Sequence, residues 1–180
     1  KRILELGSGS GFFLRNAYNK LDDDALYIAV DYNIKRHLYL KSMLEGAKKK
    51  KNVIFICADL KNLPLKDGII NGIIDISGSS NYNFTNAEFL LDGIEKYTMA
   101  ETEILASFIL FQKFDLNSFI KAENKKYYNE KYVLSKLGEL GYNIDNDTKS
   151  QTINKGGIYE NYFTSNELVY TKIIYGKKYK

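Results

Sequence analysis

A glycine-rich turn between a predicted strand and a predicted helix is the feature that most constrains how this chain can fold. Residues 3–13 read Ile-Leu-Glu-Leu-Gly-Ser-Gly-Ser-Gly-Phe-Phe, so a short apolar stretch that carries Glu5 leads into three alternating glycines. Residues 12–20 then show the apolar spacing of an amphipathic helix. Glycine adopts positive φ and has no Cβ, so the chain can turn sharply and a ligand can approach the backbone. The pattern therefore predicts a strand, a ligand-binding turn and a helix.

The spacing of the glycines separates two classes of ligand. A dinucleotide-binding turn has the pattern Gly-x-Gly-x-x-Gly, or the same pattern with alanine in the last position. Counting from Gly7 places Phe12 in the third slot, and counting from Gly9 places Leu14 there. Neither side chain permits the close packing of helix on strand that a pyrophosphate site requires. The sequence therefore argues against a dinucleotide.

Two further carboxylates follow predicted strands downstream of the turn. Residues 25–30 form an apolar run that ends at Asp31, and residues 53–58 form another that ends at Asp59. A carboxylate about twenty residues beyond such a turn can accept both hydroxyls of a ribose. Taken singly, each acid is also explained as a turn residue that ends a strand. Their order and spacing together favour a nucleoside site.

These features resemble the class I S-adenosylmethionine-dependent methyltransferases. The resemblance rests on Glu-x-Gly-x-Gly-x-Gly, on the two acids, and on residues 63–68 (Leu-Pro-Leu-Lys-Asp-Gly) before a predicted fourth strand at 69–76. It is specific over residues 3–75 and topological beyond them. Two departures are Asn71, where the family usually has aspartate, and Met-Ala-Glu-Thr at 99–102, which replaces a Gly-Gly turn.

The resemblance implies S-adenosyl-L-methionine as the cofactor. It implies that Asp31 holds the ribose, that Asp59 takes the adenine amino group and that Leu60 covers the ring. Tyr32 is predicted either to stack on the adenine or to face the core. The predicted cofactor-binding residues are Glu5, Gly7, Ser8, Gly9, Gly11, Asp31, Tyr32, Asp59, Leu60 and Asp75.

The alternation of strands and helices predicts a three-layer α/β/α sandwich with a mostly parallel sheet. Further helices are expected at 34–47, 86–97, 116–123 and 130–140, and further strands at 104–111, 142–153 and 167–175. No helix separates the last two strands, so they should pair antiparallel. The resemblance implies seven strands in the order 3-2-1-4-5-7-6. We expect one domain over residues 1–180, lacking an upstream segment that such enzymes normally carry.

Methyl transfer from a sulfonium requires chiefly that the acceptor be held in line with the methyl group, so no catalytic triad is needed. Residues 75–84, just beyond the fourth strand, are the predicted transfer site, with Asp75 and Tyr82 as the catalytic residues. Asp75 is predicted to accept a proton from the acceptor or to contact the methionine portion. An ordinary polar loop remains an equal alternative. Late aromatics line an acceptor pocket or, as we prefer, pack the hairpin: Tyr127, Tyr128, Tyr159, Tyr162 and Phe163.

The composition limits the kinds of partner that the protein is expected to bind. The net charge of +4 is lower than that of a dedicated nucleic-acid-binding protein. The lysines at 48–51 are predicted to complement the C-terminus of the preceding helix, with contact to phosphate as the alternative. No apolar run is long enough to cross a membrane. Cys57, the single cysteine, agrees with a cytoplasmic location and is predicted to be a buried structural thiol. We expect no metal, and the only histidine, His37, is assigned no role.

Three functions remain open. The first is methyl transfer to a small molecule, in preference to RNA. The second is a non-catalytic S-adenosylmethionine-binding domain that acts as a sensor or partner subunit, since a fold does not fix a function. The third is aminopropyl transfer, which calls for more acids than Asp75 near the fourth strand. Methylation of exocyclic base amines is excluded because its Pro-Pro-Tyr/Phe run is missing, and carbon-5 pyrimidine methylation because Cys57 is misplaced.

Overall fold

Strands and helices alternate from residue 2 to residue 57, as the sequence predicts. The computed structural model describes residues 1–47, 49–76, 78, 83, 88–145, 149–152 and 163–179. Its strands are β1 (Arg2–Leu6), β2 (Leu26–Asp31), β3 (Asn52–Cys57), β4 (Ile70–Ile76), β5 (Thr98–Lys113), β6 (Tyr142–Ile144), β7 (Lys149–Thr152) and β8 (Leu168–Lys178). Its helices are α1 (Phe12–Ala17), η1 (Tyr18–Lys20), α2 (Ile34–Glu45), α4 (Leu90–Ile94), η2 (Glu95–Tyr97), η3 (Ala122–Tyr128) and α5 (Glu130–Glu139), where η marks a 3-10 helix.

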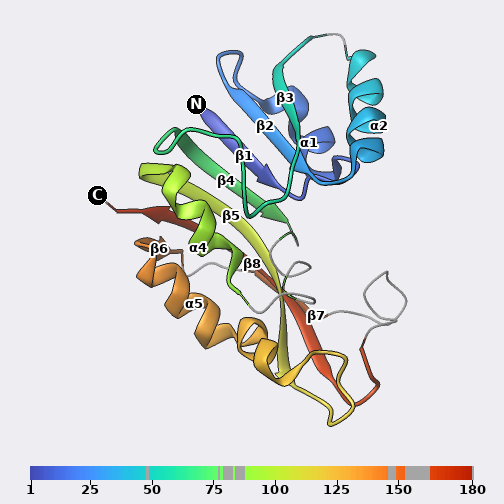
Figure 1. The fold of residues 1–180 in the computed structure, drawn as a ribbon, viewed down its shortest axis with the longest axis vertical. Coiled ribbons are helices and arrows are strands. Elements are labelled where there is room, and N and C mark those ends of the chain that lie inside the picture. Colours follow the sequence, from blue (N-terminus) through green and yellow to red (C-terminus); the bar gives the residue numbers. More distant parts are fainter. Residues whose placement is uncertain are drawn as a thin grey trace.

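All of these strands belong to one sheet, in the order β3-β2-β1-β4-β5-β8-β6, with β7 also paired to β8 (Figure 1). Neighbouring strands from β3 to β5 run parallel, and β8 runs antiparallel to β5 and β6. Because β8 is the predicted seventh strand, the predicted fold class and strand order are confirmed. The predicted strand at 142–153 is divided into β6 and β7, which pair with different stretches of β8.

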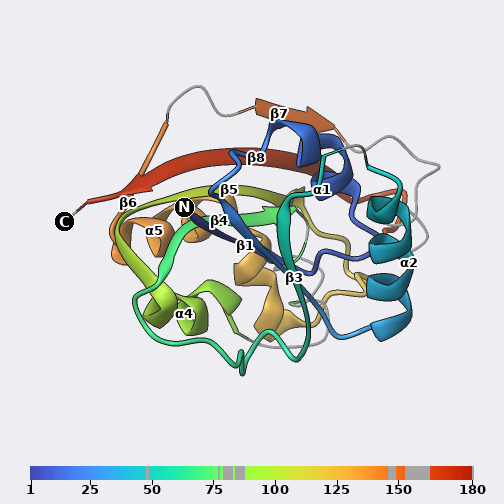
Figure 2. The same cartoon turned by 90° about the horizontal axis from the view of Figure 1, so that it is seen from above.

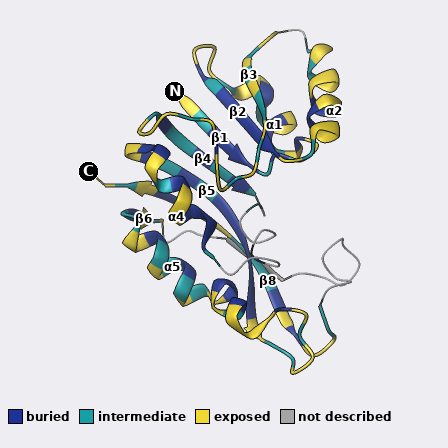
Figure 3. Cartoon of the chain, viewed as in Figure 1, coloured by how far each residue is buried: buried dark blue, intermediate teal, exposed yellow. Residues whose placement is uncertain are grey.

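Helices cover both faces of the sheet (Figure 2). Tyr27 of β2 packs with Leu14 of α1 and Leu40 of α2 in one cluster. Its neighbour Ile28 points to the opposite face, where the larger cluster includes Ile94 of α4 and residues of α5. Adjacent residues of a strand face opposite sides, so an apolar run such as β2 suits a sheet covered on both faces. Figure 3 shows the resulting burial of the central strands.

Two predicted helices differ from the structure. The helix predicted at 86–97 is the short α4 followed by η2, and residues 86–87 lie outside the described part. The helix predicted at 116–123 is wrong, because Leu116 is fully exposed and the chain becomes helical only at Ala122. Asp115 explains the error: its carboxylate accepts a hydrogen bond from the Asn117 amide at 3.1 Å, which favours a turn over a helix.

Other local predictions are confirmed. The Asn129 side chain accepts a hydrogen bond from the Tyr132 amide at 3.2 Å and caps α5, which is followed by Gly141 at φ 86°. Residues 99–102, which replace the expected Gly-Gly turn, lie inside β5 where its register with β4 shifts, and Glu101 among them adopts φ 63°. The Thr102 hydroxyl supports this irregular stretch by accepting a hydrogen bond from the Met99 amide at 3.0 Å.

Cys57 is exposed, so the prediction of a buried thiol is wrong. Its strand, β3, lies at the edge of the sheet and pairs only with β2 among the strands described, which leaves its outer side chains in contact with solvent. The Cys57 thiol donates a hydrogen bond to the Tyr32 carbonyl oxygen at 3.2 Å.

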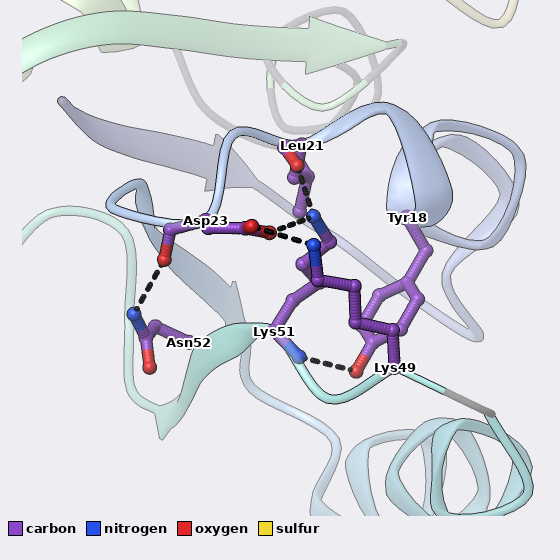
Figure 4. A network of polar contacts seen from close by, with 6 residues as sticks. All are labelled: Tyr18, Leu21, Asp23, Lys49, Lys51 and Asn52. Atoms are coloured by element: carbon purple, nitrogen blue, oxygen red, sulfur yellow. Dashed lines mark hydrogen bonds and ion pairs between the residues drawn. The ribbon is translucent and has the colours of Figure 1, made fainter.

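The lysines that follow α2 are held by local partners (Figure 4). Lys49 and Lys51 form ion pairs with the two carboxylate oxygens of Asp23 at 2.5 and 2.7 Å, which lowers the pKa of Asp23 to about 2. Lys50 donates to the Leu44 carbonyl oxygen near the end of α2 at 3.3 Å. These contacts support the prediction that the cluster complements the helix C-terminus, because its described cations already have partners.

Candidate functional site

The glycine turn between β1 and α1 has the left-handed geometry that its sequence predicts. Gly7, Gly9 and Gly11 adopt φ values of 66°, 55° and 80°. The absence of a Cβ at Gly11 is also required sterically, because an added Cβ would lie 2.2 Å from a methyl carbon of Leu40 on α2. The turn is anchored to β2 by a 2.8 Å hydrogen bond from the Ser8 amide to the Val30 carbonyl oxygen.

Asp31, the last residue of β2, is directly connected to this turn. Its Oδ2 accepts a 2.8 Å hydrogen bond from the Gly9 amide, and its Oδ1 accepts one of the same length from the Asn33 amide. The side chain is only 3% exposed. A carboxylate offers about four acceptor positions, so each oxygen retains capacity for one more donor. Sequence-distant residues predicted to share a nucleoside site therefore meet here.

Glu5 lies on β1 two residues before the turn and is 3% exposed. Burial raises the pKa of its carboxyl to about 7, the Tyr27 hydroxyl opposes that rise, and the charge of Asp31 adds to it. A nearby cation would lower the pKa of such a buried acid and favour its ionised form. Perturbed pKa values of this kind are typical of functional sites.

The chain after β4 approaches the turn closely at Gly78. A Cβ built on Gly7 would lie 3.5 Å from the Gly78 Cα, and a Cβ on Gly78 would lie 2.5 Å from both the Leu6 carbonyl oxygen and Asp75 Oδ1. Asp75 itself is completely buried on β4. The structure thus brings the start of the predicted transfer segment to the turn, whereas Tyr82 lies outside the described residues.

The predicted adenine-binding residues lie at the ends of β2 and β3. Asp59 is exposed, and its Oδ1 accepts a hydrogen bond from the Lys61 amide at 2.9 Å. Leu60 is half-buried against the larger core cluster. Tyr32 is 77% exposed, so the alternative in which it faces the core is wrong. Tyr32 and Asp59 both present side chains to solvent at this edge of the sheet.

Sequence reasoning missed His37, which lies directly behind the turn. The imidazole is buried and its Nε2 lies 3.0 Å from Ser8 Oγ. The Ser8 side chain, predicted to bind the cofactor, is therefore turned toward α2. The helical spacing of the sequence could have predicted this burial, because His37 lies on the inward-facing side of α2 with Leu40 and Leu44.

The late aromatic residues that the structure describes pack together. Tyr127 and Tyr128 are buried, and the ring of Phe111 contacts those of Tyr128 and Phe163 at centroid distances of 5.6 and 5.3 Å. This supports packing over an acceptor pocket for these residues. Tyr159 and Tyr162 lie outside the described residues.

A cavity of about 310 Å³ lies away from the turn. Its lining includes Lys1 and Asn71, at the starts of β1 and β4, whereas the turn follows the opposite end of β1. In the part of the chain that the structure describes, no helix is long and apolar enough to cross a membrane. Among the same residues, no cluster of three or more histidine, cysteine or acidic side chains could hold a metal ion.

No protein-family model and no curated protein sequence matches the chain. Solved structures do match. An S-adenosylmethionine-dependent methyltransferase from Methanosarcina mazei is 13% identical with a TM-score of 0.67, and the match covers 99% of this chain and 93% of that one. A phosphoethanolamine N-methyltransferase from Haemonchus contortus, solved with S-adenosylhomocysteine, is 11% identical with a TM-score of 0.70, over 100% and 49% of the two chains.

The cyclase SpnF matches equally well in shape. It is 12% identical with a TM-score of 0.67, and the match covers 99% of this chain and 75% of the cyclase. At such identities a structural match shows the fold, and a fold can host several reactions. The chain has the Rossmann-like fold of the class I S-adenosylmethionine-dependent methyltransferases.

Proposed function

We propose that this protein binds S-adenosyl-L-methionine at the turn between β1 and α1 and transfers its methyl group to an acceptor. One observation carries the proposal: the acid at the end of β2, Asp31, is joined to the Gly9 amide by a 2.8 Å hydrogen bond. This bond supports placing the carboxylate that we propose binds the ribose and the bare backbone of the turn in one site. Structural similarity to methyltransferases supports the same reading.

The residues present fit this cofactor. Asp31 retains acceptor capacity for the ribose hydroxyls, and the exposed Asp59 is available to the adenine amino group, with Leu60 and Tyr32 for its ring. Glu5 is a buried acid beside the turn, and the methionine portion of the cofactor carries an ammonium and a sulfonium. Desolvated opposite charges attract strongly, so Glu5 would be ionised when the cofactor is bound. The cofactor supplies an activated methyl group, and the protein supplies orientation.

The acceptor is proposed to enter over residues 75–84. The contact of Gly78 with the end of β1 supports this, because it places the start of the segment beside the turn. Asp75 and Tyr82 remain the predicted catalytic residues. A small-molecule acceptor is favoured over RNA, because Lys49 and Lys51 are held by Asp23 and the net charge is only +4. The composition supports a cytoplasmic location.

Binding without transfer is the second candidate function. The complete burial of Asp75 favours it, because a residue with no exposed surface does not reach an acceptor unless its neighbourhood shifts. In that case the protein would be a sensor or partner subunit.

An assay for methyl transfer separates the two functions. Purified protein and isotopically labelled S-adenosylmethionine are incubated with metabolite and RNA fractions of the source cell, and labelled products are identified by mass spectrometry. Transfer to a small molecule supports the proposal, and binding with no labelled product in any fraction supports the alternative. Tyr82→Ala should lower the rate at saturating cofactor while leaving cofactor affinity unchanged, whereas the exposed Tyr179→Ala should change neither.

A further inference from the structure

His37 is buried at the back of the glycine turn, where its side chain contacts Ser8 of the turn and Phe55 of β3. Its side chain is 2% exposed, and its Nε2 lies 3.0 Å from Ser8 Oγ, which is buried as well. Its ring meets that of Phe55 on β3 edge-on at a centroid distance of 5.5 Å. Burying a polar ring in such a place costs free energy unless its polar atoms form hydrogen bonds.

The contact with Ser8 closes a ring of hydrogen bonds around the turn. The Gly9 amide donates to Asp31, which also accepts from the Asn33 amide, and the Asn33 carbonyl oxygen accepts from the His37 amide at 3.4 Å. The side chain of His37 then returns to Ser8, next to Gly9. The turn is thus attached to the first turn of α2 by two routes, one through Asp31 and one through His37.

The surroundings of the imidazole indicate how its proton is placed. The other ring nitrogen, Nδ1, is buried and has no hydrogen-bond partner among the residues that the structure describes. Burying an unpaired N–H is less favourable than burying an unpaired nitrogen lone pair, so the neutral tautomer with its proton on Nε2 fits best. Burial lowers the pKa of His37, although the charge of Asp31 opposes that effect. In this tautomer the Nε2–H group donates to Ser8 Oγ.

We propose that His37 is a positioning residue, which holds the glycine turn in its left-handed conformation through the hydrogen bond to Ser8. The three glycines of the turn, at alternating positions, have wide conformational freedom. Fixing Ser8, which lies between two of them, therefore lowers the conformational entropy that cofactor binding must otherwise remove. The effect on cofactor affinity rests on the proposed function, but the ordering of the turn does not.

The test uses Ser8→Ala, His37→Leu and the double variant that carries both changes. A fourth variant, His37→Gln, retains a donor near the position of Nε2. Leu44→Ala, on the same buried stripe of α2 but not bonded to the turn, is the control for lost packing. Two quantities are measured for each variant: the hydrogen-exchange rate of the Gly9 amide and the dissociation constant of S-adenosylhomocysteine.

Ser8→Ala and His37→Leu should each accelerate Gly9 exchange and weaken binding by roughly fivefold, the worth of one hydrogen bond. The double variant should be no worse than either single variant, because both remove the same bond. His37→Gln should largely restore both quantities, and Leu44→Ala should change neither beyond its effect on global stability. Additive effects, or unchanged Gly9 exchange in His37→Leu, would show that His37 only fills space and would overturn the proposal.

His37 is the single histidine of the sequence, so its imidazole can be observed directly. In protein without an affinity tag, nitrogen-detected NMR should show that Nε2 carries the proton. The Nε2 chemical shift should change in Ser8→Ala. A ring insensitive to Ser8→Ala would contradict the proposal. If wild-type protein binds no S-adenosylhomocysteine while Gly9 exchange responds as stated, the proposed function fails and the role of His37 stands.

Discussion

The Gly9 amide donates a 2.8 Å hydrogen bond to Asp31 Oδ2, although 22 residues separate the two in the sequence. This bond fixes the distance between the end of β2 and the turn after β1. A nucleoside that contacts the backbone of the turn would therefore find the Asp31 carboxylate at a set position. Preorganisation of this kind improves affinity because less freedom is lost on binding.

Replacing Asp31 with alanine should weaken binding of S-adenosylhomocysteine at least tenfold. The change removes the carboxylate that we propose accepts hydrogen bonds from the ribose hydroxyls, and charge-assisted hydrogen bonds contribute about 1.5–3 kcal/mol each. Isothermal titration calorimetry measures the effect, with circular dichroism to verify folding. Asp67→Ala, which removes an exposed carboxylate before β4, is the control and should bind normally. Equal affinities for wild type and Asp31→Ala would place the ribose elsewhere.

The raised pKa of Glu5 predicts a stability that decreases with pH. The folded protein holds a proton on Glu5 up to about pH 7, whereas the unfolded chain loses it near the ordinary glutamate pKa of 4.5. Between these values the folded state binds more protons, so the contribution of Glu5 falls as pH rises, by on the order of 3 kcal/mol. Denaturant unfolding of wild type and Glu5→Gln at pH 5 and pH 8 should show Glu5→Gln gaining relative stability at pH 8.

Comparison of the two proteins is essential, because the lowered pKa of His37 acts in the opposite direction in part of this range. An unchanged stability difference between pH 5 and pH 8 would contradict the assigned burial of Glu5. Binding of the cationic S-adenosylmethionine should show the reverse trend: its affinity should rise with pH through about 7 in wild type and stay level in Glu5→Gln.

Two glycines with similar backbone conformations should respond differently to alanine. Gly11 and Gly68 have φ values of 80° and 62°, but an added Cβ meets Leu40 at 2.2 Å at Gly11 and nothing within 4 Å at Gly68. Gly68→Ala should cost about 1–2 kcal/mol from the left-handed conformation alone. Gly11→Ala should cost about 1–3 kcal/mol more from overpacking, and should also weaken cofactor binding. Thermal unfolding that ranks the two variants equally would exclude the predicted clash.

Glu101 is a residue at which the chain stores strain. Its φ of 63° is costly for a side chain with a Cβ, so Glu101→Gly should raise the unfolding free energy by about 1 kcal/mol. Both Glu101→Gly and the control Glu101→Ala lose the exposed ion pair with Lys177, which contributes little. Only the glycine variant should therefore gain stability, as measured by chemical denaturation. A similar gain in both would mean that removing the Glu101 side chain, and not relieving the backbone, raises the stability.

Local chemistry explains which features could be predicted from the sequence. The strands predicted at 25–30, 53–58 and 69–76, the glycine turn and the cap at Asn129 depend on neighbouring residues, and each lies within a residue of where the sequence indicates. The exposure of Cys57 depends on the place of β3 at the sheet edge, which the apolar run alone does not convey. The contact of His37 with Ser8 joins residues 29 positions apart, so a local pattern does not reveal it.

The helix expected at 116–123 failed for a related reason. Its apolar spacing is real, but Asp115 also accepts hydrogen bonds from Thr164 and Asn166, almost fifty residues later, and these hold the turn in place. Long-range contacts of this kind cannot be predicted from a local sequence pattern, and they override a weak helix propensity.

Cofactor binding is the central claim, and calorimetric titration of the wild-type protein with S-adenosylhomocysteine and with NAD, in parallel, tests it most directly. Gly9 bonded to Asp31 is our proposed site for a single adenosine, and the glycine spacing lacks the third small residue of a pyrophosphate-binding turn. The account predicts saturable one-to-one binding of S-adenosylhomocysteine and no heat of binding with NAD. Saturable binding of NAD without measurable affinity for S-adenosylhomocysteine would contradict it.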